Sequence, residues 1–309
     1  MEGKIEHSAS RIAAGLINPF IGPKLNLPFA FQQCIDGSLD FFGKWNTQFD
    51  DFLFKPESLL RIFKSEQQKA KWDDLRRNTV SSRYTLSSIS SEELRDSGIM
   101  GKYGAGETKA FRLDIEKFLQ LSRQKLKYMN CWVEETFDYK EVNKNEIIIF
   151  AEGYNVCENP YFNWLPFAPA QGEILEFTGP QSPALSNGTW FLPNKLNFIA
   201  GSTWRHTDLK SGPTKTGYDT ICENLKYIPI SKYKKFNHLS GIRSGTLDRN
   251  PIIGQHPKLG NLYIFNGFGS RGSTTIKLHA DHLTELIING VKLPQYIDLN
   301  RFITLFPKI

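Results

Sequence analysis

The chain has 309 residues, of which 40% are hydrophobic and 23% charged, with a formal net charge of +6 and a pI near 9.0. This composition is typical of a soluble globular protein of about two domains, and it excludes a disordered chain. No apolar run reaches the ~18 residues of a membrane span, and the N-terminus has no apolar signal-peptide core. Four cysteines without a C-x-x-C pair favour reduced thiols in a cytoplasmic protein over a zinc site or a disulfide framework.

The first part of the chain is predicted to be mainly helical. Residues 8–24 are small and end in Pro and Gly, which indicates a loop or short helix followed by a turn. Residues from about 29 to 77 carry apolar side chains at mixed spacings of three and four, so they are predicted to be helical. Residues 79–106 are polar and rich in Gly and Ser, which predicts a long connection. Residues 112–129 are predicted to form an amphipathic helix with Asp114 in its first turn.

The second part of the chain has the pattern of strands. The unbroken apolar run 147–151 predicts a parallel strand buried on both faces. Short strands alternating with turns over 171–237 predict an antiparallel sheet. Residues 261–267 predict another buried strand that leads into a helix over 273–290, with His279 and His282 on its polar face. These elements predict an α/β (α+β) protein, in which a nucleotide-binding type of domain is interrupted by a second, β-rich domain.

A glycine motif lies between that last strand and helix. Gly267, Gly269 and Gly272 spell G-x-G-x-x-G, and glycines at a helix N-terminus let backbone amides approach a ligand closely. The dinucleotide-binding form of this motif also needs a strand ending in an acid about 20 residues further on. Residues 290–296 contain Pro294 and no acid. The motif is therefore not predicted to bind a pyrophosphate, and tight strand-to-helix packing remains an alternative interpretation.

Arg243 is the candidate for binding an anionic substrate. It lies between Gly241 and Gly245, where little side-chain bulk surrounds it, so its guanidinium can hold a carboxylate in a bidentate contact. The alternative is a salt bridge to Asp248 or Asp281. On the residues alone, the salt bridge is the favoured reading.

Several segments together resemble the FAD-dependent oxidoreductases of the D-amino-acid oxidase and glycine oxidase superfamily. "SGIRSGTLDRNPIIG" resembles the G-x-R-x-x-x-x-D-x-x-P-x-I-G block of that family, and "NLYIFNGFGSRGSTT" resembles its final strand–glycine–helix block. "SASRIAAGLINP", "IIIFAEGYN" and "LPFAPAQGEIL" resemble further blocks in family order. The G-S-R-G form is similar to the flavin domain of the bifunctional tRNA wobble-uridine modification enzyme.

The resemblance implies FAD as the cofactor and assigns roles to residues. The glycine motif and the helix dipole would stabilise negative charge at the pyrimidine end of the flavin by about 1 kcal/mol. The segment 14–16 would lie along the isoalloxazine ring, and the two serines before it would lie nearer the phosphates. Arg243 would hold the substrate carboxylate, which reverses the preference for a salt bridge. The implied cofactor-binding residues are Ser8, Ser10, Ala14, Gly15, Leu16, Ala151, Gly153, Gly267, Phe268, Gly269, Ser270, Arg271, Gly272, Ser273 and Thr274.

The implied reaction is hydride transfer from a carbon next to an amine to flavin N5, followed by reoxidation by an acceptor such as oxygen. The chemistry belongs to the cofactor, so neither a catalytic side chain nor a metal is required. The expected substrate is a small amine or amino acid. The implied fold is an incomplete FAD-binding Rossmann-like domain (1–35, 107–160 and 238–290), interrupted by a substrate domain with an antiparallel sheet (36–106 and 161–237) and followed by a C-terminal tail (291–309).

One departure from the family is at the N-terminus. The family begins with a strand, a G-x-G-x-x-G, a helix and an acid-ended strand, roughly 40 residues in all. Met1 stands seven residues before Ser8. We therefore expect a chain truncated at its N-terminus, or one that obtains this unit from another chain, with the strand at 146–151 or 261–265 left with an unpaired apolar edge.

Two alternative functions remain at this stage. One is a non-enzymatic interaction or regulatory remnant of a flavoprotein. The other is a tRNA-modifying flavoenzyme, suggested by the G-S-R-G likeness, the basic pI and "SKYKKF" at 231–236. The charge run is weak support for it, because such runs are usually solvated surface.

Overall fold

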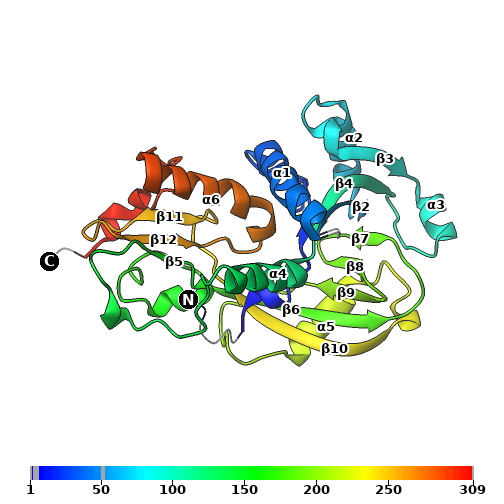
Figure 1. Ribbon diagram of the computed structural model, residues 1–309. Helices are drawn as coiled ribbons and strands as arrows, with labels where there is room; N and C mark the ends of the chain where they lie inside the picture. The colour runs from blue at the N-terminus through cyan, green and yellow to red at the C-terminus, as the bar shows by residue number, and fades with distance from the viewer. Residues whose placement is uncertain (1, 3–6, 50–52, 308–309) are drawn as a thin grey trace.

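The computed structural model describes residues 2, 7–49 and 53–307, which form two sheets with helices around them (Figure 1). The strands are β1 Leu16–Ile17, β2 Phe54–Ile62, β3 Thr85–Ile89, β4 Ala105–Leu113, β5 Ile148–Phe150, β6 Ala170–Thr178, β7 Ala184–Ser186, β8 Trp190–Asn194, β9 Asn197–Gly201, β10 Lys234–Arg243, β11 Ile252–Gln255 and β12 Leu262–Asn266. The α-helices are α1 Phe31–Phe49, α2 Glu66–Arg77, α3 Ser91–Asp96, α4 Ile115–Tyr128, α5 Lys215–Asn224 and α6 Gly272–Asn289. Short 3₁₀ helices include Ala9–Arg11 and Leu299–Leu305. None of the helices in the described part of the chain has the length and apolar character needed to cross a bilayer.

The larger sheet has nine strands in the order β1-β4-β2-β7-β8-β9-β6-β10, with β3 paired to β4. Most neighbours are antiparallel, and β2 with β7 is a parallel pair. An aromatic stack from α1, β2 and β4 fills the core on one side, with ring centroids 5.4 Å apart between Phe42 and Phe54 and 5.5 Å between Phe54 and Phe111. The antiparallel sheet predicted over 171–237 is thus present and is part of a larger mixed sheet.

The smaller sheet has the order β11-β12-β5, with β5 parallel and β11 antiparallel to β12. Side chains of β12 alternate between two cores: Leu262 and Ile264 pack on one face, and Tyr263 packs under α6 on the other. Figure 1 shows α6 lying over this sheet and α1 lying between α6 and the larger sheet. The strand and helix predicted on either side of the glycine motif are therefore confirmed as β12 and α6.

The prediction for residues 29–106 is wrong in part. α1 and α2 are helices as expected, but β2 separates them, and the expected connection at 79–106 contains β3, α3 and the start of β4. β2 has mixed apolar spacing because its burial does not alternate regularly along the strand. β4 is buried at most positions, including the polar residues Thr108 and Arg112. Its polar composition therefore did not indicate a buried strand. The helix α5, capped by Thr214, also lies inside the region predicted to be strands.

Two finer predictions are also corrected. β5 is parallel, as expected, but not buried on both faces, because Ile147 is 60% exposed and Ile149 is 45% exposed. Within the described residues β5 has one neighbour, β12, and forms the edge of the smaller sheet. His279 is buried rather than on a polar face, because α6 packs against α1 on one side and the ring of Tyr296 on the other.

The expected domain boundaries cut through strands of the larger sheet. The boundary between residues 106 and 107 lies inside β4, and the boundary between 237 and 238 lies inside β10. The expected tail contains Ile297 and Leu299, which are fully buried, and the Ile253 N–H donates to the Ile297 carbonyl. The segment after α6 is thus packed against β11.

Candidate active site

A cavity of about 640 Å³ lies among residues of the larger sheet, the glycine motif and α6, in the size range of small-molecule and cofactor sites. It brings together three distant parts of the sequence: the segment around β1, the end of β10, and the glycine motif before α6. The residues expected from the sequence that line it are Ser10, Ala14, Gly15, Leu16, Arg243, Gly269, Ser270, Arg271, Gly272, Ser273 and Thr274.

The remaining expected residues lie beside this lining. Ser8 pairs with Ile242, next to Arg243. The Gly153 carbonyl accepts a hydrogen bond from Asn266 Nδ2 at 2.8 Å, and the Gly267 N–H donates to Asn266 Oδ1 at 2.7 Å. Ala151 is exposed near the end of β5, and Phe268 packs on Phe265 with ring centroids 4.8 Å apart.

Gly15 brings the backbone of its segment close to β4. Its φ is +66°, and a Cβ built there would lie 1.8 Å from the carbonyl oxygen of Leu113. The Leu113 N–H in turn donates to the Gly15 carbonyl at 2.9 Å. Only glycine permits this approach. It presents the backbone of residues 14–16 as one wall of the cavity.

The N-terminus of α6 faces the cavity without a cap. Arg271 is the N-cap residue, and no side chain accepts from the first turn. The N–H groups of Thr274 and Thr275 donate to the Arg271 carbonyl. Those of Gly272 and Ser273 have no acceptor among the described residues, so they are left for a ligand. Uncapped amides at the positive end of a helix dipole favour an anionic or electron-rich group.

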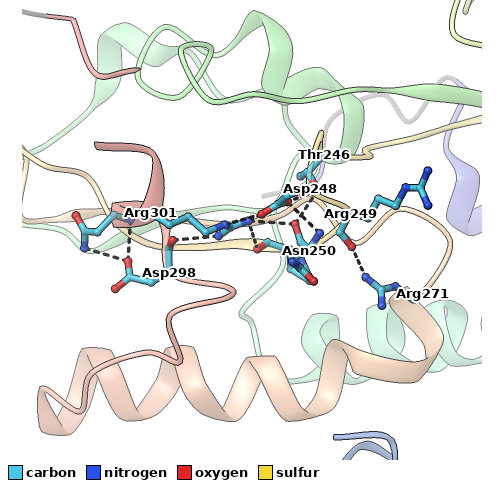
Figure 2. Close-up of polar contacts among 9 residues, drawn as sticks. Thr246, Asp248, Arg249, Asn250, Arg271, Asp298 and Arg301 are labelled. Carbon is cyan, nitrogen blue, oxygen red and sulfur yellow. Dashed lines mark hydrogen bonds and ion pairs between the residues drawn. The ribbon is translucent and has the colours of Figure 1, made fainter. Parts of the chain in front are cut away.

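The loop between β10 and β11 is held beside the glycine motif by a polar network (Figure 2). Arg301 donates to both carboxylate oxygens of Asp248, at 2.8 and 3.3 Å, and to the Pro251 carbonyl at 3.0 Å. Although burial acts to raise it, the pKa of Asp248 is below its ordinary value because Arg301 and nearby groups donate hydrogen bonds to the carboxylate. The Arg271 guanidinium donates to the Arg249 carbonyl, which joins this loop to the start of α6.

Arg243 has no acidic partner among the described residues. Its Nη1 donates to the Thr203 carbonyl at 3.1 Å and its Nη2 to Ser202 Oγ at 2.7 Å, and its guanidinium lies 4.5 Å from the ring centroid of Trp204. A Cβ on Gly172 would lie 2.1 Å from Nη2, so this glycine makes room for the side chain. Burial lowers the pKa of Arg243 to about 10, which leaves it cationic at neutral pH.

The two salt bridges considered for Arg243 are absent from the described structure. Asp248 pairs with Arg301, and Asp281 pairs with Lys277. The residue-based preference for a salt bridge was therefore wrong. The guanidinium is free to bind a carboxylate within the cavity.

Sequence reasoning missed part of the lining. Arg61 and Lys64 line the cavity, together with Trp190 from β8 and Trp204 from the loop after β9. Arg61 lies in a segment predicted to be helical, so the pattern gave no reason to place it in a site. The described residues contain no group of three His, Cys, Asp or Glu side chains placed to hold a metal ion.

Comparison with known proteins identifies the class to which this fold and site belong. Residues 2–286 match the family described as FAD dependent oxidoreductase (DAO). The chain belongs to this family, and its cofactor is FAD. The family resemblance drawn from the sequence blocks is thereby confirmed.

Solved structures share the fold. Glycine oxidase from Bacillus cereus ATCC 14579 is similar with a TM-score of 0.77 at 14% identity, over 94% of this chain and 88% of that one. Iminodiacetate oxidase from Chelativorans sp. BNC1 has a TM-score of 0.76 at 15% identity, over 96% and 90%. L-proline dehydrogenase from P. horikoshii has a TM-score of 0.77 at 17% identity, over 98% and 91%. At these identities the likeness concerns the fold, and it confirms the mixed α/β class.

The residues present fit the ring end of a flavin. The cavity is large enough, the close backbone of residues 14–16 offers a flat wall, and the uncapped amides of α6 suit the electron-rich pyrimidine edge. For the diphosphate end, the described residues contain no second strand–G-x-G-x-x-G–helix unit beside β12 and α6. The fit therefore applies to the isoalloxazine part of the cofactor.

Proposed function

We propose that this oxidoreductase acts on a small amine that carries a carboxylate, such as an amino acid. The observation that carries the proposal is Arg243, a cation in the cavity wall with no acidic partner among the described residues. The flavin, when bound, supplies the acceptor for the electron pair of the C–H bond next to nitrogen. The names glycine oxidase, iminodiacetate oxidase and L-proline dehydrogenase each denote a substrate with both nitrogen and carboxylate, which supports this choice.

The chain's own residues orient such a substrate. Arg243 offers its guanidinium to the carboxylate in a charge-assisted contact, while Ser202, the Thr203 carbonyl and the Trp204 ring hold that guanidinium in place. Ile174 and Trp190 line the same cavity and exclude water from its walls. Fixing one end of the substrate in this way limits which carbon can approach the ring plane beside residues 14–16.

The test compares two substrate classes with the FAD-loaded protein. Amino acids should reduce the bound flavin under anaerobic conditions, as followed by its visible absorbance. For the carboxylate substrate, Arg243→Met should raise KM by ~30- to 150-fold, because a charge-assisted contact is worth about 2–3 kcal/mol. An amine without a carboxylate should be affected much less.

Arg243→Lys is the matched control, since it keeps the positive charge but loses the two-pronged guanidinium donor. Its KM for the carboxylate substrate should lie between those of the wild type and Arg243→Met. Equal loss for both substrate classes would show that Arg243 does not bind the carboxylate. A flavin that no amine reduces would refute the proposed substrate class.

We also infer separate roles for two parts of the cavity wall. The glycine motif with α6 and the segment around β1 would hold the flavin, and strands β6, β8 and β10 would supply the substrate wall through Ile174, Trp190 and Arg243. The N-terminal dinucleotide-binding unit stays a hypothesis. An in-frame G-x-G-x-x-G in the coding sequence immediately upstream of Met1 would support it.

A tRNA substrate is a second hypothesis, and it rests on the G-S-R-G likeness and basic residues near 231–236. Lys232 ends a 3₁₀ helix, and Lys234 and Lys235 begin β10; all three are exposed. Binding of tRNA that weakens steeply with salt would support the hypothesis, and no binding at low salt would remove it. Membership of an oxidoreductase family argues against the non-enzymatic alternative.

A further inference from the structure

A second cationic group lies in the cavity on a strand far from Arg243 in the larger sheet. Arg61 belongs to β2, is 5% exposed, and lines the cavity. Its Nη2 donates to the Gly22 carbonyl at 3.1 Å, but its buried Nε has no hydrogen-bond partner. No carboxylate among the described residues forms an ion pair with it. Burial lowers the pKa of Arg61, as expected for a charge held away from water.

Lys64 accompanies Arg61 at the rim of the cavity. Its Nζ lies 3.5 Å from where a Cβ on Gly188 would stand, and Gly188 also lines the cavity. Burial and the charge of Arg61 both lower the pKa of Lys64. Two like charges therefore face one end of the cavity, and neither has an acidic partner in the described chain.

The charged residues that line the cavity all carry positive charge. The lining contains four cations, Arg61, Lys64, Arg243 and Arg271, and no Asp or Glu. Arg271 is engaged with the Arg249 carbonyl, whereas Arg61 and Lys64 donate to no group that carries charge. Arg61 is buried, and a buried, unpaired charge is costly unless a ligand pairs with it, whereas Lys64 is exposed at the rim. A cleft lined by a single sign of charge also concentrates ligands of the opposite sign.

We propose that Arg61 and Lys64 form a second anion subsite, which binds a second anionic group of the substrate. The substrate would then be a dianionic amine or amino acid, with one carboxylate at Arg243 and another carboxylate or a phosphate at Arg61 and Lys64. This proposal rests on the function proposed for Arg243.

The separation of β2 and β10 in the larger sheet determines how long that substrate must be. β2 and β10 are separated by β7, β8, β9 and β6, so the path between them is five strand spacings, about 24 Å along the sheet. Curvature of the sheet and side chains that reach inward shorten this path across the cavity. The two anionic groups are therefore joined by an extended chain, longer than that of glycine.

The test measures binding by calorimetry on the full chain, with and without added FAD. The probes are straight-chain dicarboxylates of increasing length, monocarboxylates of the same lengths, and phosphonocarboxylates. The dicarboxylate or phosphonocarboxylate of matching length should bind at least 10-fold more tightly than the monocarboxylate. Which of the two binds better identifies the second anionic group.

Variants separate the two subsites. Arg61→Met should remove the advantage of the second anionic group and leave monocarboxylate affinity unchanged, and Arg61→Lys should restore part of the advantage. Arg243→Met should weaken both classes. Lys69→Met, which removes an exposed charge of α2 outside the cavity, should change neither. Equal affinities for mono- and dicarboxylates at every length would overturn the proposal.

Two further measurements distinguish the proposed role of Arg61 from a structural role and from a role in binding the cofactor. Because Arg61 has no acidic partner, Arg61→Met should not lower the melting temperature of the ligand-free protein, and a clear drop would indicate a structural role instead. A loss of FAD affinity with unchanged dicarboxylate affinity would assign the subsite to the cofactor phosphates and overturn the proposal. Flavin reduction is measured separately, so the proposed oxidation can fail while the dicarboxylate test still gives an answer.

Discussion

His279 is a buried histidine of α6, the helix that follows the glycine motif, and carries no assigned chemical role. It lies beside a smaller cavity of about 250 Å³ that is also lined by Cys34, Arg271 and Tyr296. Its Nδ1 lies 3.4 Å from Nδ1 of His282. Burial, and then the nearby His282 and Arg271, lower the pKa of His279 to about 4. The ring is therefore neutral at physiological pH.

This burial makes stability depend on pH. Between pH ~6.5 and about 4 the unfolded histidine binds a proton that the folded one does not, so stability falls as pH falls through this window. At pH ~5 the loss relative to pH ~7.5 is about 2 kcal/mol. We expect His279→Phe to lack this part of the pH dependence in urea unfolding measured at the two pH values. His7→Phe is the control, and an unchanged pH slope in His279→Phe would contradict the assignment.

At the scale of elements, the contact between the β1 segment and β4 forms one wall of the cavity. Gly15 and Gly22 both have a positive φ, +66° and +68°. A Cβ on Gly15 would meet the Leu113 carbonyl, whereas a Cβ on Gly22 would meet nothing within 4 Å. Comparing the stability of an alanine variant at each position therefore separates the cost of the positive φ from the cost of the contact with Leu113.

We expect Gly22→Ala to cost about 1 kcal/mol, the ordinary penalty of a left-handed conformation. Gly15→Ala should cost more, at least 3 kcal/mol, because the two backbones must also move apart. It should also weaken ligand binding in the cavity. Chemical denaturation of both variants measures the difference. Equal costs would mean that the close approach at Gly15 is not needed for the fold.

At the scale of the whole molecule, the smaller sheet ends on an apolar edge at β5. Ile147 and Ile149 are exposed there, and the described residues place no strand on the side of β5 opposite β12. An exposed apolar edge strand is a template for pairing with another chain. We therefore expect the chain to self-associate as its concentration rises.

Ile149→Lys should reduce that self-association, because a charge on an edge strand opposes strand pairing. Leu196→Lys is the control: Leu196 is 94% exposed, but it lies in the turn between β8 and β9 and not on the edge of the smaller sheet. Concentration-dependent light scattering compares the three proteins. The same reduction from both variants would indicate general solubility rather than edge pairing.

The sequence predicted local elements well where one segment decided its own structure. The helix over 112–129 and the strand-to-helix unit around the glycine motif are present because amphipathic spacing and glycine punctuation act within a few residues. β2, β3 and β4 were missed because their burial comes from partners far along the chain: Leu59, for example, pairs with Thr108. Arg61 was missed for the same reason, since a residue on an unrecognised strand cannot be assigned to a site.

The sequence by itself indicated the family and FAD through the resemblance of its blocks, and it made the glycine motif and Arg243 candidates for the site, because such blocks are short stretches of residue types that can be compared without the fold. Only the tertiary structure decided what the glycine motif faces. It showed that the N-terminus of α6 is uncapped, that Arg243 lacks the salt bridges the residues had suggested, and that Arg61 and Lys64 line the same cavity. The reason is that charge pairing and burial depend on distances between residues far apart in the chain, which neither composition nor periodicity encodes.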